Sequence, residues 1–141
     1  MTNQLETIFH NTIPVALIIP EGIHIDGISY LTDPLNSLQI GLHNRPKGMK
    51  IAPHVHTVPS PVTLTEFQEV LMILSGSIEL TLYTKTGEII AKRILKTGDS
   101  VLLMREGHQV EYLEETRIFE VKQGPYPGAE TAKIYINNTN T

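Results

Sequence analysis

Apolar residues recur along this chain in short runs, many of which alternate with polar residues, and turn-forming residues separate the runs. No stretch combines helical periodicity with helix caps over the ten or so residues that a helix needs. Alternation with a period of two, interrupted by Gly, Pro, Asn and Asp, is typical of short β-strands. The pattern predicts strands at residues 38–45, 51–56, 67–74, 77–83, 88–95, 100–104, 108–113 and 117–122.

Turn sequences fill the gaps between these predicted strands. They include "SG" at 75–76, "KTGD" at 96–99 and "REG" at 105–107, and Gly76, Gly98 and Gly107 are expected to take positive φ there. Many short strands at this spacing indicate an all-β sandwich or closed barrel. We expect an N-terminal arm or hairpin, the barrel, and a C-terminal strand with its tail, at residues 1–33, 34–128 and 129–141.

The run "EVLMIL" at 69–74 does not alternate. Strands with this pattern are buried on both faces. One face would lie in the core and the other against a different surface. A second subunit is one cover that would serve, so a homodimer is expected.

Composition narrows the class of protein. At 141 residues and 40% hydrophobic, the chain fits one domain with a real core. The net charge is -4 with no block of like charge, so neither nucleic acid nor a membrane is expected as a partner. The absence of cysteine leaves His, Asp and Glu for metal or acid–base chemistry. The first residues lack a signal-peptide pattern, which predicts a cytoplasmic protein.

The sequence "APHVHTVPSP" at 52–61 contains two histidines that are one residue apart. In a strand, His54 and His56 share a face and can converge on a metal ion. Other residues frame them in a specific order. Five residues separate Gly48 from His54, and Glu69 follows after a loop. Six residues separate Glu69 from Gly76, and a "GD" turn and an apolar strand then lead to His108.

This order resembles the two motifs of the cupin superfamily over residues 38–122, and "QEVLMILSG" and "IGLHNRPKG" are similar to small single-domain bacterial cupins. The resemblance implies an antiparallel jelly-roll barrel that binds one divalent metal through His54, His56, Glu69 and His108. The sequence departs from the motifs twice. The spacer at 57–68 is long, so Glu66 or Gln68 could take the place of Glu69, and Met104 stands where proline is expected in a turn that is one residue short.

Three imidazoles and one carboxylate suit Mn, Fe, Co, Ni or Zn, with open positions for water or substrate. His108 has a plainer interpretation as a turn residue, and Glu69 as a solvated strand end. Candidate substrate contacts lie on the strand before the first motif and at the barrel exit; they are His43, Arg45, Lys122 and Tyr126.

The resemblance favours a metal-dependent enzyme, of isomerase, epimerase or lyase type, acting on a small carbohydrate-like or keto-acid molecule. The sequence does not assign its catalytic acid or base. An iron-dependent dioxygenase would use the same ligands. A non-catalytic module that binds or senses a small ligand is the third possibility, because fold does not imply function.

Overall fold

The structure is a computed structural model that describes residues 4–57 and 64–136. Within these residues the chain forms ten strands and no helix, so the predicted all-β class is confirmed. The chain divides into two compact units. Unit 1 comprises Met1–Ile23 and Glu66–Thr141, and unit 2 is His24–Thr65. Each is described by itself below.

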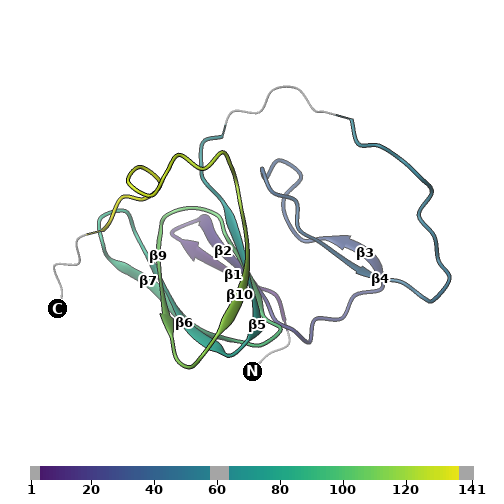
Figure 1. Cartoon of the computed structure of the whole chain (residues 1–141), viewed down its shortest axis with the longest axis horizontal. Coiled ribbons are helices and arrows are strands. Elements are labelled where there is room, and N and C mark those ends of the chain that lie inside the picture. Colours follow the sequence, from purple (N-terminus) through teal and green to yellow (C-terminus); the bar gives the residue numbers. More distant parts are fainter. Residues whose placement is uncertain (1–3, 58–63, 137–141) are drawn as a thin grey trace. The chain divides into compact units, whose positions relative to one another are not determined.

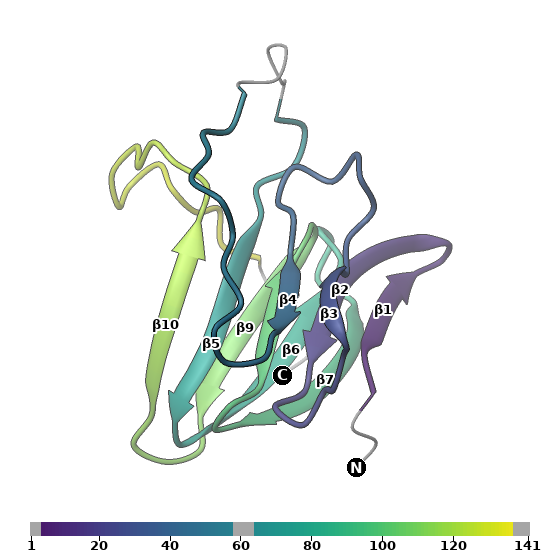
Figure 2. The ribbon, with the colours of Figure 1, turned by 90° about the vertical axis from the view of Figure 1, so that its right-hand side faces the viewer.

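Unit 1 contains two antiparallel sheets (Figures 1 and 2). The five-stranded sheet has the order β1 (Glu6–His10), β2 (Ile13–Ile19), β8 (Ser100–Leu103), β5 (Glu69–Ser75) and β10 (Arg117–Lys122). The three-stranded sheet has the order β7 (Ile89–Lys96), β6 (Ser77–Tyr83) and β9 (Gly107–Tyr112). Neither sheet closes on itself within the described residues, so the jelly-roll barrel stays a prediction.

The two sheets of unit 1 enclose one apolar core. Strands of both sheets contribute residues to it, among them Val15, Leu71, Ile73, Ile78, Leu80, Leu95 and Val101. In β5 the burial alternates, because Leu71 and Ile73 face the core while Met72 and Leu74 are 43% and 41% exposed. One face of "EVLMIL" is therefore covered within the chain. That a second subunit covers the other face stays a prediction.

Two of the predicted turn glycines take the expected conformation. Gly76 has a φ of 89° and Gly98 a φ of 90°. A Cβ on Gly76 would overlap the backbone of Glu115 and Thr116, so a side chain is excluded there by space as well as by φ. The expectation for Gly107 is wrong, because the positive φ in that turn belongs to Glu106, at 68°.

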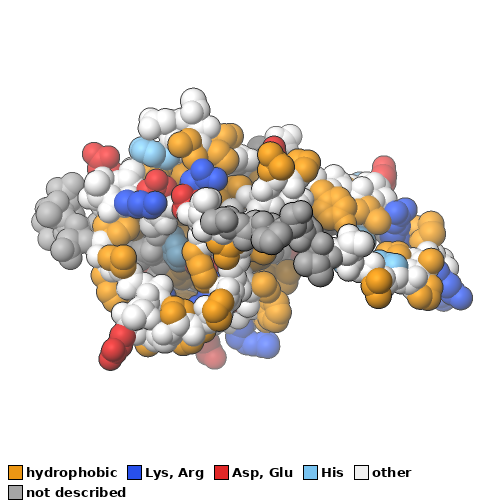
Figure 3. Space-filling model, turned by 90° about the horizontal axis from the view of Figure 1, so that it is seen from above, with side chains coloured by type: hydrophobic (Ala, Val, Ile, Leu, Met, Phe, Trp, Pro, Cys, Tyr) orange, Lys and Arg blue, Asp and Glu red, His pale blue; other side chains and the backbone are white. Residues whose placement is uncertain are grey.

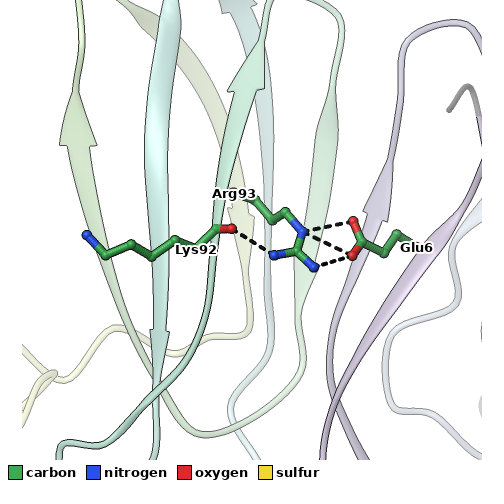
Figure 4. Close-up of polar contacts among 3 residues, drawn as sticks. All are labelled: Glu6, Lys92 and Arg93. Atoms are coloured by element: carbon green, nitrogen blue, oxygen red, sulfur yellow. Dashed lines mark hydrogen bonds and ion pairs between the residues drawn. The ribbon is translucent and has the colours of Figure 1, made fainter. Parts of the chain in front are cut away.

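An ion pair fastens the edges of the two sheets to each other. Glu6 lies on β1 and Arg93 on β7 (Figure 4). Arg93 Nε donates to both carboxylate oxygens of Glu6 at 3.0 and 3.1 Å, and Nη2 donates to Oε1 at 2.5 Å. The hydrogen bonds from Arg93 hold the pKa of the Glu6 carboxyl below its usual value, although burial acts in the opposite direction.

The N-terminal stretch is part of the main sheet of unit 1. Strands β1 and β2 form a hairpin, and β2 then pairs with β8 from Ala16 to Ile19. Its residues 15–19 are buried. At the other end of the chain, residues 129–136 form no strand, and 137–141 lie outside the described residues.

Unit 2 contains one hairpin, in which β3 (Gly27–Tyr30) pairs with β4 (Gly41–Asn44). The strand predicted at 51–56 is wrong, because residues 50–57 have no regular structure. Pro53 lacks the N–H that a strand interior needs, and no strand within residues 4–57 and 64–136 pairs with this segment. The predicted loop at 57–68 falls in part on residues 58–63, which lie outside the described residues. Among the residues that the structure describes, no helix is long and apolar enough to cross a membrane.

Candidate metal centre

Glu69 and His108 meet at one end of unit 1. Glu69 is the first residue of β5, in the five-stranded sheet, and His108 is the second residue of β9, in the three-stranded sheet. Glu69 Oε1 lies 2.8 Å from His108 Nε2. The side chain of Glu69 is 16% exposed and that of His108 is 36% exposed. The pair therefore bridges the two sheets and is accessible from solvent mainly through the imidazole.

The surroundings of Glu69 favour its charged form. Its pKa is lowered, first by the hydrogen bond from His108 and then by the positive charges of His108, Lys122 and Lys133, while burial acts in the opposite direction. Glu69 is thus a carboxylate at neutral pH. A carboxylate in contact with an imidazole provides two of the ligand types that divalent transition metals take.

The two competitors of Glu69 have different surroundings. Gln68 is 3% exposed, and its backbone pairs with Gln123, whose Oε1 accepts from the N–H of Gln68 at 2.8 Å. The N–H of Gln123 donates to the carbonyl of Gln68 at 3.2 Å. Glu66 precedes β5 and is half-buried. Of these three residues, Glu69 is the one in an ion pair with His108.

His54 and His56 are neighbours in unit 2, although they do not lie on a strand. Their ring centroids are 5.0 Å apart, with the planes inclined at 71°. His54 Nδ1 lies 2.8 Å from the carbonyl oxygen of Ala52. Because a carbonyl can only accept, Nδ1 carries the proton and Nε2 of the neutral ring keeps its lone pair. A backbone carbonyl that fixes the tautomer in this way is a usual second partner of a metal-binding histidine.

The four predicted ligands therefore occur as two pairs, one in each compact unit. Across residues 4–57 and 64–136, no group of three or more His, Cys, Asp or Glu side chains gathers as a metal site. The donor chemistry of each pair fits a transition metal by itself. That the two pairs share one metal remains a prediction from the sequence motif.

The four predicted substrate contacts are divided in the same way. Lys122 is the cross-strand partner of Glu69, and Tyr126 lies close by, with its ring centroid 5.6 Å from Lys122 Nζ. Lys122 also forms an ion pair with Glu120 at 3.0 Å. His43 and Arg45 belong to unit 2, where both are exposed. Lys122 and Tyr126 are thus the two that unit 1 places beside the Glu69–His108 pair.

Sequence reasoning missed two residues near this pair. Lys133 acts on the charge of Glu69, and Ile136 lies against Gly107, the residue before His108. The sequence holds no signal for either contact, because both arise from an irregular segment that folds back after β10.

Comparison with known proteins places no further limit on the function. No family model matches the chain. Neither does any curated protein or any solved structure.

Proposed function

We propose that this protein is a cupin metalloprotein with a jelly-roll fold, which binds one divalent transition metal through His54, His56, Glu69 and His108. The order and spacing of the motif residues support the proposal. The observation that carries it is the 2.8 Å contact between Glu69 and His108, which stand far apart in the sequence and come from different sheets. A motif assigned by spacing gains weight when its members meet in the fold.

The proposed activity is isomerisation, epimerisation or lyase chemistry on a small carbohydrate-like or keto-acid substrate. A bound metal would act as a Lewis acid on a substrate oxygen. The protein's own groups have separate tasks. Glu69 contributes negative charge, the carbonyl of Ala52 orients the His54 ring, and the apolar core of unit 1 provides a rigid support for His108.

The first test is metal content, measured by elemental mass spectrometry on untagged protein. We expect about one equivalent of a transition metal in the wild type, and at least a tenfold loss in His56→Ala and His108→Ala, since each removes a ligand. His24→Ala is the matched control, because His24 is exposed and, among the described residues, its one ion pair is with Asp26, at 3.4 Å.

Circular dichroism of each variant checks that the sheets persist. The metal proposal fails if folded wild type binds none of Mn, Fe, Co, Ni and Zn when they are supplied. It also fails if His24→Ala loses as much metal as His108→Ala does.

A further inference from the structure

The segment after β10 crosses the end of unit 1 at which Glu69 and His108 meet. It starts beside Glu69, because Lys122, the last residue of β10, pairs with Glu69 in register. It reaches the start of β9 at Ile136, whose Cδ1 occupies the space that a Cβ on Gly107 would take. The segment is the yellow loop that continues from β10 in Figure 1. It therefore spans the distance between the strands that carry Glu69 and His108.

The end of β10 and the segment that follows it carry two lysines. Lys122 is held by Glu120 at 3.0 Å and lies over the ring of Tyr126. Lys133 lies in the segment between Tyr126 and Ile136 and is exposed. Figure 3 looks onto this end, where basic, acidic and histidine side chains lie close together on the surface of unit 1.

Neutralising Glu69 does not account for these lysines. Glu69 already has an ion-pair partner in His108, and among the described residues no lysine nitrogen lies within the 4.0 Å of an ion pair with it. Lys133 likewise forms no ion pair with any described carboxylate. The exposed ammonium of Lys133 is therefore available to a negatively charged ligand. The pair of Lys122 with Glu120 on the same strand is an exposed contact of little free energy, which such a ligand can replace.

We propose that Lys122 and Lys133 form an anion-binding subsite beside the Glu69–His108 pair, and that the substrate carries a carboxylate or phosphate group. The substrate part of this inference rests on the proposed function, whereas anion binding by the two lysines does not. The metal or the imidazole would then face the reacting part of the substrate, while the lysines hold its charged group.

The test is a titration of the full chain with malonate and, separately, with inorganic phosphate, at constant ionic strength and followed by two-dimensional NMR. We expect saturable shifts in the amides of residues 107–108 and 122–136. Lys133→Gln and Lys122→Gln should each weaken binding about tenfold, as the loss of one charge-assisted hydrogen bond does. Lys96→Gln is the matched control, because Lys96 is exposed and lies at the opposite end of β6, where it pairs with Ser77.

Preference for malonate identifies a carboxylate substrate, and preference for phosphate a phosphorylated one. The proposal is overturned if neither anion saturates at millimolar concentrations. It is also overturned if both lysine variants bind as the wild type does. Metal content measured on the same samples separates the two proposals. Saturable anion binding by protein that takes up no metal contradicts only the proposed function, and metal-loaded protein that binds neither anion contradicts only the anion subsite.

Discussion

Two ion pairs join the sheets of unit 1, and they differ in every respect that matters for function. Glu6 and Arg93 connect the sheet edges through three nitrogen–oxygen contacts, and their side chains are 42% and 40% exposed. Glu69 and His108 connect the sheets at one end through a single contact, and Glu69 is 16% exposed. The first pair uses a guanidinium that is always charged, whereas the second uses an imidazole that can release its proton or bind a metal.

The contrast separates a structural role from a chemical one. A two-pronged arginine–carboxylate pair fixes geometry but contributes little free energy when it is this exposed. A partly buried carboxylate that contacts an imidazole holds two strands together less firmly than an arginine–carboxylate pair does. It is better suited to binding a metal. The comparison therefore implies that the core holds the sheets together and that Glu6–Arg93 aligns their edges, while Glu69–His108 is the pair that the proposed metal site would use.

The largest effect on the free energy of unfolding is expected from a substitution in the core between the two sheets. Leu80 lies on β6 and is 0% exposed. Leu80→Ala should lower the free energy of unfolding by about 2–5 kcal/mol, because it removes apolar contacts and leaves a cavity. Chemical denaturation followed by circular dichroism measures this loss. A loss no larger than that caused by removing either ion pair would show that the core is not what joins the sheets.

The next largest effect is on metal affinity, and it distinguishes Glu69 from Glu6. Glu69→Gln keeps the size of the side chain and removes its charge, so we expect metal affinity to fall by more than about tenfold while the unfolding midpoint changes little. Glu66→Gln is the control for the alternative ligand, and Glu6→Gln for a general effect of charge. Metal binding measured by isothermal titration decides between them. If Glu66→Gln loses the metal and Glu69→Gln keeps it, Glu69 is not the ligand.

A smaller effect measures the structural pair directly. A double-mutant cycle of Glu6→Gln and Arg93→Gln should give a coupling free energy of about 0.2–1 kcal/mol, the range of exposed ion pairs. High salt should reduce it, because both side chains are accessible to ions. A coupling of several kcal/mol would mean that the Glu6–Arg93 pair contributes as much to stability as core residues do. The pair would then do more than align the sheet edges.

The smallest effect is the pH dependence of that pair. Arg93 lowers the pKa of Glu6 from its reference value of 4.5, so the folded state holds the charged carboxylate more strongly than the unfolded state does. The resulting stability is fully present above about pH 4.5 and is lost as the pH falls through the lower pKa of the folded state. Glu6→Gln should therefore flatten the acid limb of a stability–pH curve. An unchanged limb would mean that other carboxylates set the acid sensitivity.

Much of unit 1 could be predicted from the sequence because its strands carry local signals. The predicted strand at 117–122 coincides with β10, and those at 77–83 and 100–104 match β6 and β8 within one residue. Alternation and turn glycines are properties of a few adjacent residues, so they are visible without a partner strand.

The failures concern contacts that no local pattern records. The strand predicted around His54 has no neighbouring strand among the described residues, and the pairing of β2 with β8 joins residues that lie far apart in the sequence. Of the candidate site, the resemblance to the two cupin motifs selected Glu69 and His108, which do meet. Of the two lysines at this end of unit 1, the sequence predicted Lys122 as a substrate contact. It did not predict Lys133, which lies on a segment without regular structure.

The pairing of β2 with β8 also determines the order in which the chain can fold. Strands β1 and β2 precede the other strands of unit 1 in the sequence, and their apolar residues Val15 and Ile18 belong to a core whose other strands come much later. On the ribosome, this hairpin must wait with its apolar face unburied until β8 has emerged. Contacts of such long range slow folding and expose a growing chain to aggregation. Strands β1 and β2 are therefore made before the strands that bury their apolar face.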